Sequence, residues 1–163
     1  MTHPTIEGAG KWVLVPGTLC TDRVFDPLLQ SLGVARSVAR VIPVDAPDVQ
    51  DYDQPLRKAV TGAEIVCGFS LGAMVLAHNL DALKAARAIV LLASNPFPDP
   101  PGNRANREML RDRVMAGGAT DWVRENWASM SISPRADHPD LVAAMAEDTA
   151  HLIAAQMGDL FSF

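Results

Sequence analysis

The sequence predicts an α/β protein of three layers, in which helices cover both faces of a mostly parallel sheet of about four strands. Two observations support this prediction. Over residues 1–94, short apolar runs alternate with helical patterns, as in chains built from βαβ units. The runs are continuously apolar, which is typical of strands buried on both faces. From residue 95 onward only helical patterns appear, so we expect a core over 1–94 and a helical segment over 95–163, packed together as one folding unit.

The strand and helix patterns follow one another in a regular order. Pro16-Gly17 ends the first strand pattern, and Gly33 ends the first helical pattern. After a proline-rich linker, we expect one helix with Thr120 as its N-cap and another that runs from Pro139 to Gly158. The predicted strands are residues 12–15, 39–44, 65–67 and 88–93, and the other predicted helices are 24–32, 54–60, 71–78 and 103–115.

Composition and charge exclude several classes of function. A formal net charge of −5 provides no basic surface for nucleic acid or for anionic membranes. The two cysteines, Cys20 and Cys67, are too few for a disulfide framework and lack the spacing of metal ligands. The sequence shows no signal peptide, no membrane-spanning apolar stretch, no G-x-G-x-x-G and no P-loop lysine. We therefore expect a cytoplasmic protein that uses no metal and no cofactor.

The segment Gly68-Phe69-Ser70-Leu71-Gly72 carries the most specific motif of the chain, G-x-S-x-G. It lies between a predicted buried strand and a predicted helix, which is the context of a serine nucleophile elbow. In such a turn the strand and helix come so close that only very small residues fit two positions either side of the serine. The amide of Leu71 faces the space before the hydroxyl, where it stabilises a developing oxyanion. We predict Ser70 as a nucleophile; the alternative is a glycine-rich turn with an incidental serine.

A second loop, Pro16-Gly17-Thr18-Leu19-Cys20, follows the first predicted strand. Because the loops at the carboxyl ends of parallel strands converge on one site, this loop should lie beside the serine. We expect the Thr18 amide to be the second oxyanion donor. The alternative is a simple Pro-Gly turn without a catalytic role.

These two segments, together with the apolar strand over 89–94, resemble the oxyanion loop, the nucleophile elbow and the following strand of small bacterial α/β-hydrolases. The resemblance covers about residues 11–157, and the later helices resemble a cap domain of that family. It implies acyl transfer to water from a small ester, thioester or lactone through an acyl-Ser70 intermediate, or a related carbon–carbon hydrolysis. Trp122, Trp127 and Met130 in the cap-like helices indicate an apolar pocket for the acyl group.

In that family the serine is followed in the chain by an acid and a histidine, on loops after later strands. No strand pattern appears after Ala93, so by this resemblance we expect a truncated sheet without those two loops. The remaining candidates are His138 and His151 as the base, and Asp99 and Asp137 as the acid. For each of them an ordinary surface role is the alternative, and another chain could supply the base instead.

Two functions from different classes therefore remain open. The first is a serine hydrolase acting on a small acyl substrate. The second is a truncated, non-catalytic α/β-hydrolase-like module that acts in binding or assembly. The fold is compatible with both.

The fourth predicted strand has a consequence for association. In the family's order the four strands lie as 2-1-3-4, which leaves the segment from Ile89 to Leu92 at an exposed apolar edge. We expect this edge to pair, either in a homo-oligomer or with a partner that completes the sheet. The alternative is that the helical segment folds back over the uncovered face.

Overall fold

The computed structural model describes residues 11–95, 100, 102–130 and 138–157. Its centre is a four-stranded sheet in the order β2-β1-β3-β4, and each neighbouring pair of strands is parallel. The predicted parallel sheet and its strand order are therefore confirmed. The strands are β1 (Lys11–Val15), β2 (Ala39–Val41), β3 (Ala63–Phe69) and β4 (Ala88–Leu92).

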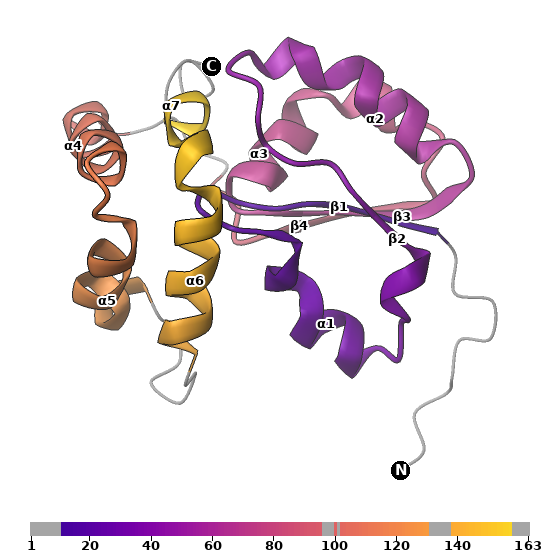
Figure 1. Ribbon diagram of the computed structural model, residues 1–163. Helices are drawn as coiled ribbons and strands as arrows, with labels where there is room; N and C mark the ends of the chain where they lie inside the picture. The colour runs from indigo at the N-terminus through magenta and orange to yellow at the C-terminus, as the bar shows by residue number, and fades with distance from the viewer. Residues whose placement is uncertain (1–10, 96–99, 101, 131–137, 158–163) are drawn as a thin grey trace.

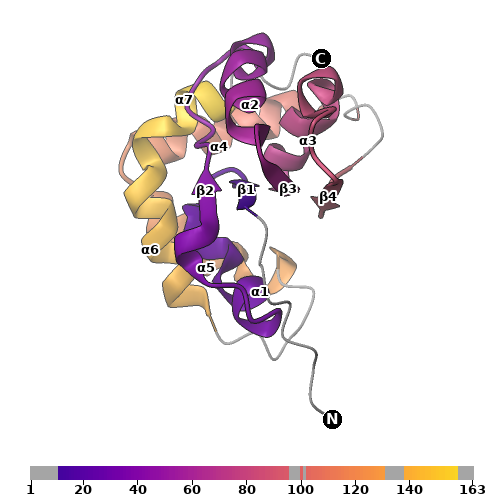
Figure 2. The same ribbon diagram turned by 90° about the vertical axis from the view of Figure 1, so that its right-hand side faces the viewer.

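Helices cover both faces of this sheet, which makes three layers (Figures 1 and 2). On one face lies α1 (Asp26–Ser31), and on the other lie α2 (Asp53–Val60) and α3 (Leu71–His78). Short 3₁₀ turns precede α1, β2, α2 and β4; they are Asp22–Phe25, Arg36–Val38, Val49–Tyr52 and Leu80–Leu83.

The side chains of β1 show why the strands are continuously apolar. Val13 and Val15 pack in a cluster with the buried side chains of α2 and α3. Trp12 and Leu14 point to the opposite face and pack with Phe25 beside α1. Because helices cover both faces, neither set of alternating positions is available to polar residues.

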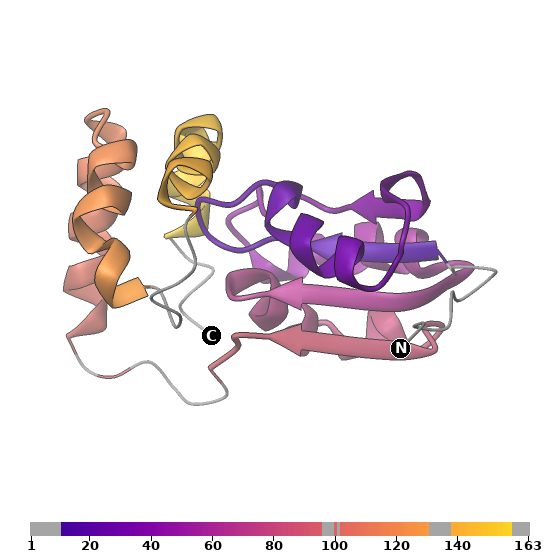
Figure 3. The ribbon, with the colours of Figure 1, turned by 90° about the horizontal axis from the view of Figure 1, so that it is seen from below.

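Four helices form a further layer beyond the carboxyl ends of the strands (Figures 1 and 3). They bury an apolar cluster of their own, to which Leu19 from the loop after β1 also belongs. The helical layer thus packs on the core through that loop. None of the described helices has the length and apolarity that crossing a membrane requires. The four helices are α4 (Asn103–Met115), α5 (Ala119–Met130), α6 (Pro139–Thr149) and α7 (Ile153–Gln156).

β2 and α5 differ from the bounds that the sequence predicts. β2 ends at Val41 instead of residue 44, because Pro43 has no N–H with which to continue the ladder. Thr120 is not an N-cap, since α5 begins one residue earlier. Its hydroxyl instead donates to Glu147 Oε2 at 3.0 Å and so links α5 to α6.

The predicted helix from Pro139 to Gly158 is interrupted. A 3₁₀ turn, Ala150–Leu152, separates α6 from α7. Just before this turn the Thr149 hydroxyl donates to the Met145 carbonyl (2.8 Å). Such a bond competes with the backbone hydrogen bonds of the helix, and it lies where the helix is interrupted.

Candidate active site at Ser70

Ser70 lies in the sharp turn between β3 and α3, with φ 51° and ψ −118°. A positive φ is unfavourable for a residue that has a Cβ, and it persists only where the surroundings impose it. Here the Ser70 N–H donates to the Leu92 carbonyl at 2.8 Å. The Ser70 carbonyl accepts from the N–H groups of Ala73 (3.0 Å) and Met74 (3.2 Å). The turn is therefore held by the end of β4 on one side and by the first turn of α3 on the other.

Two glycines flank Ser70 at positions where no side chain fits. A Cβ on Gly68 would lie 2.7 Å from the backbone nitrogen of Ala73, and a Cβ on Gly72 would lie 2.1 Å from the Val15 carbonyl oxygen. Both distances are far shorter than van der Waals contact. β1, β3 and α3 meet at the serine because these two positions have no side chain, as the G-x-S-x-G motif predicts.

The loop after β1 lies directly against this turn. A Cβ on Gly17 would be 3.0 Å from the Ser70 Cβ, so the two backbones are in close contact. The Cys20 N–H donates to the Gly17 carbonyl at 3.2 Å and closes a turn, within which Leu19 has a positive φ of 54°. The two loops that the sequence singles out thus meet at the carboxyl ends of β1 and β3.

Thr18 and Leu71 supply the two backbone amides expected to bind an oxyanion. Leu71 is the first residue of α3, so its N–H has no partner within the helix. In the loop after β1, the amides of Leu19 and Cys20 are hydrogen-bonded, whereas that of Thr18 has no such bond with another described residue. Both N–H groups are placed next to the serine turn, and their role as oxyanion donors stays a prediction.

A cavity of about 460 Å³ opens in front of Ser70, and we call it the inner cavity. Its volume lies within the range of small-molecule sites. No charged side chain is among its described lining residues, and the polar ones all come from the core. The core side is Thr18, Leu19, Cys20, Val24, Phe69 and Ser70. The side formed by the helical layer is Leu110, Trp122, Val123, Trp127, Val142, Met145 and Met157. The expected apolar pocket thus includes two of the residues that the sequence indicates, Trp122 and Trp127.

Gln156, at the end of α7, fastens the helical layer to the loop that carries Thr18. The residue is only 1% exposed. Its Oε1 accepts from the Leu19 N–H (3.0 Å), and its Nε2 donates to the Val44 carbonyl (3.0 Å). One side-chain amide therefore satisfies two buried backbone groups from the loops after β1 and β2. In the sequence Gln156 stands on an otherwise apolar helical stripe, and a polar residue there indicates a buried hydrogen-bond partner.

The Cys20 thiol also lines the inner cavity, but it does not compete with Ser70 as a nucleophile. Burial raises the pKa of Cys20 to about 12, and a backbone hydrogen bond from Gly17 offsets only part of the effect. Burial also raises the pKa of Cys67, in β3, to about 11. Both thiols are therefore protonated at neutral pH, whereas the thiolate is the reactive form of cysteine.

None of the described histidines lines the inner cavity. His78, at the end of α3, is exposed, and its Nε2 lies 3.0 Å from Nε2 of Gln50. His151 is exposed in the 3₁₀ turn between α6 and α7. His138 is exposed as well. It lies one helical turn before Val142, and Val142 lines the inner cavity.

The roles of the two predicted acids stay a prediction. Asp99 and Asp137 lie outside the described residues. Within the described ranges, no three His, Cys, Asp or Glu side chains gather as a metal site requires. What the structure brings together at the cavity is thus a strained serine, two backbone amides and an apolar wall.

The strand order, the helices on both faces and the serine turn between β3 and α3 define an α/β-hydrolase-like fold. Among solved structures, the chain is similar to MenH from S. aureus, an α/β-hydrolase-type enzyme, with a TM-score of 0.60 and 14% sequence identity. The match covers 93% of this chain and 67% of that chain. No protein-family model and no curated protein matches the chain. At this level of identity the likeness shows the fold, and function has to be argued from the site.

Proposed function

We propose that the chain is a serine hydrolase that cleaves a small ester, thioester or lactone through an acyl-Ser70 intermediate. The observation that supports this most is the serine turn itself. Ser70 is held at φ 51°, against a glycine loop and in front of a cavity with no charged lining among the described residues. Strain of this kind clusters at catalytic sites, where it keeps a reacting group exposed.

The proposed reaction has two halves. Ser70 Oγ attacks the carbonyl carbon, and the carbonyl oxygen becomes an oxyanion that accepts hydrogen bonds from the Thr18 and Leu71 amides. When the tetrahedral intermediate collapses, the alcohol or thiol leaves with the proton that Ser70 lost. Water then attacks the acyl-enzyme by the same route and releases the acid. The amino end of α3 adds a favourable positive potential at the oxyanion.

The proton of Ser70 requires a general base, and we propose His138 as the first to test. Among the described histidines it is one helical turn from a residue that lines the inner cavity. Catalytic hydrogen bonds are often long in unliganded enzymes and tighten when substrate binds. A base from a second chain remains the competing source.

A matched pair of substitutions tests this base. His138→Gln should slow acylation of Ser70 by about 10²- to 10⁴-fold, the usual contribution of a general base. His151→Gln, at an exposed position in the 3₁₀ turn after α6, should leave the rate unchanged. Equal rates for both variants and the parent protein would exclude His138 and direct the search to a second chain.

The nucleophile is tested with a fluorophosphonate probe at neutral pH. Ser70 Oγ attacks phosphorus and displaces fluoride, so intact-protein mass spectrometry should show one adduct, which Ser70→Ala abolishes. Ser31→Ala, in an exposed serine of α1, is the control and should retain the adduct. An unlabelled parent protein would refute the hydrolase proposal.

A specific observation also favours a second candidate, a non-catalytic module that binds an apolar ligand. The inner cavity is well formed, yet no described histidine lines it. This module would bind apolar small molecules with unchanged affinity after Ser70→Ala and would show no labelling of the serine. The same two measurements therefore separate the two candidates.

A further inference from the structure

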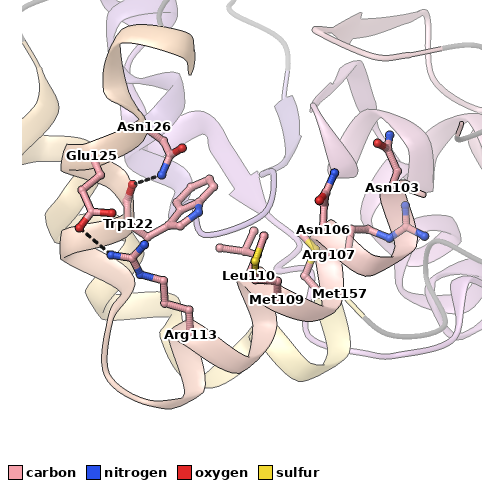
Figure 4. A pocket seen from close by; sticks show the side chains of 10 residues that line it. All are labelled: Asn103, Asn106, Arg107, Met109, Leu110, Arg113, Trp122, Glu125, Asn126 and Met157. Carbon is pink, nitrogen blue, oxygen red and sulfur yellow. Dashed lines mark hydrogen bonds and ion pairs between the residues drawn. The ribbon is translucent and has the colours of Figure 1, made fainter. Parts of the chain in front are cut away.

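A second cavity adjoins the inner one on the side away from the sheet. It lies between α4 and α5, has a volume of about 830 Å³, and is called the outer cleft here (Figure 4). Polar and charged side chains, among them Asn106, Arg113 and Glu125, line it together with apolar ones. Arg113 and Glu125 form an ion pair at 2.7 Å, which lowers the pKa of the Glu125 carboxyl and keeps the pair charged.

Three apolar side chains belong to both cavities. Leu110 on α4, Trp122 on α5 and Met157 after α7 line the inner cavity on one side and the outer cleft on the other. All three belong to the apolar cluster of the helical layer. We call them the dividing wall, because they are shared between a cavity without charged lining residues and a cleft that has them.

The inner cavity extends from the core to the outermost helices. Ser70 lines it from the core and Leu110 lines it from α4, which lies with α5 on the side of the helical layer away from the sheet (Figure 3). Since one water occupies about 30 Å³ of liquid, a cavity of this volume holds roughly 15 non-hydrogen atoms. An uncharged space of that capacity, lined from the serine turn to α4, fits an ester group joined to an unbranched chain of about eight to ten carbons.

We propose that the inner cavity binds a medium-length fatty acyl chain, with its carbonyl at Ser70 and its methyl end against the dividing wall. This inference rests on the proposed hydrolase function and names the substrate class. Each methylene that the cavity buries improves binding about fourfold, until the chain meets Leu110, Trp122 and Met157. The dividing wall therefore determines the longest chain that is accepted.

A series of p-nitrophenyl esters with acyl chains from two to sixteen carbons tests the proposal. For the parent protein, kcat/KM should rise with length to an optimum near eight to ten carbons and then fall. Trp122→Ala joins the inner cavity to the outer cleft and should move the optimum to longer chains. Val142→Phe fills the inner cavity from α6 and should move it to shorter chains.

Met109→Ala is the matched control. Met109 lines the outer cleft but not the inner cavity, and it is 66% exposed. Its removal should leave the optimum unchanged. The proposal would be overturned if kcat/KM of the parent protein showed no optimum in chain length. It would also be overturned if Trp122→Ala and Val142→Phe left that optimum unchanged.

Binding without turnover separates this inference from the hydrolase function. Calorimetry with free fatty acids of the same lengths on the Ser70→Ala variant should give the same optimum, shifted again by Trp122→Ala. If fluorophosphonate leaves Ser70 unlabelled while this binding series holds, the acyl site stands and the hydrolase proposal fails. If Ser70 is labelled but fatty acids bind without regard to length, the hydrolase proposal stands and the acyl-chain proposal fails.

Discussion

Single residues without side chains allow the serine turn to form. Gly68 and Gly72 let β3 and α3 approach the end of β1, and Gly17 lets the neighbouring loop contact Ser70. These close contacts hold Ser70 at its unfavourable positive φ, because the surrounding backbone leaves no room for another conformation. The small residues of the motif therefore account for the geometry of the serine turn.

Gly72→Ala should be strongly destabilising. Its Cβ would lie 2.1 Å from the carbonyl oxygen of Val15 and 2.4 Å from that of Pro16, so the backbone would have to move. We expect a loss of about 3 kcal/mol or more in the free energy of unfolding, measured by urea denaturation. Gly33→Ala is the control: its φ is +66° but the space around it is open, and it should cost only about 1 kcal/mol. Equal losses in the two variants would show that the crowding at Gly72 is relieved at little cost.

The thiols of Cys20, which is partly buried, and Cys67, which is buried, should make the free energy of unfolding fall at alkaline pH. Folding raises the thiol pKa from 9.0 to about 12 at Cys20 and about 11 at Cys67, so above pH 9 the unfolded chain loses these protons first. Their contribution is complete below pH 9 and is lost as the pH rises towards 11 and 12. Each thiol should remove on the order of 1.4 kcal/mol per pH unit in that window.

Urea denaturation at pH 8 and pH 10 measures this effect. The double variant Cys20→Ala/Cys67→Ala should lose clearly less stability between the two pH values than the parent protein. Tyr52, whose pKa burial also raises, accounts for part of the remaining fall in both proteins. An identical fall in the double variant would contradict the assignment to the thiols.

At the scale of elements, α7 connects the helical layer to the core. The short helix brings Gln156 to the loops after β1 and β2, and Leu19 from the first of these loops is buried among the helices. The position of the Thr18 amide therefore depends on a helix more than 130 residues away in the chain. A change in α7 should therefore affect the loop after β1 before it affects the sheet.

Gln156→Leu tests this connection. The variant keeps a side chain of similar size but leaves the Leu19 N–H and the Val44 carbonyl buried without partners. We expect a loss of about 2–4 kcal/mol in the free energy of unfolding, together with slower fluorophosphonate labelling of Ser70. Gln30→Leu, at an exposed position of α1, is the control for both measurements. A stability loss with unchanged labelling would mean that Gln156 does not position the loop after β1 for the reaction at Ser70.

At the scale of the whole molecule, β4 forms an edge of the sheet. β4 pairs with β3 on one side, and no described strand pairs with it on the other. Ile89 and Leu91 are 39% and 40% exposed on this strand. An exposed apolar edge strand is a template for pairing with another chain.

We predict self-association through this edge. Light scattering at micromolar concentration should give a mass above the 17.5 kDa of one chain. Leu91→Lys places a charge on the edge and should return the mass to that of a monomer. Leu32→Lys, at a comparably exposed leucine after α1, is the control and should leave the higher mass unchanged. A monodisperse monomer for the parent protein would refute the prediction.

Much of the core could be predicted because its signals are local. Continuous apolar runs mark strands buried on both faces, and glycines two positions either side of Ser70 mark the turn. The bounds of β2 and of the last helices were harder to predict. The end of β2 depends on where Pro43 interrupts the strand pairing, and the break between α6 and α7 lies at the hydrogen bond from the Thr149 hydroxyl to a carbonyl. Thr120 was misassigned for a similar reason: its partner, Glu147, lies on another helix.

The sequence by itself determined the parallel sheet and the place of the serine turn, because periodicity and glycine spacing act over a few residues. The strand order was predicted only through the resemblance to α/β-hydrolases. Only the tertiary structure decided what faces Ser70. The dividing wall, the partners of Gln156 and the distance of the histidines from the inner cavity all depend on how the helical layer packs against the core. Such contacts join residues far apart in the chain, and no local pattern encodes which of them meet.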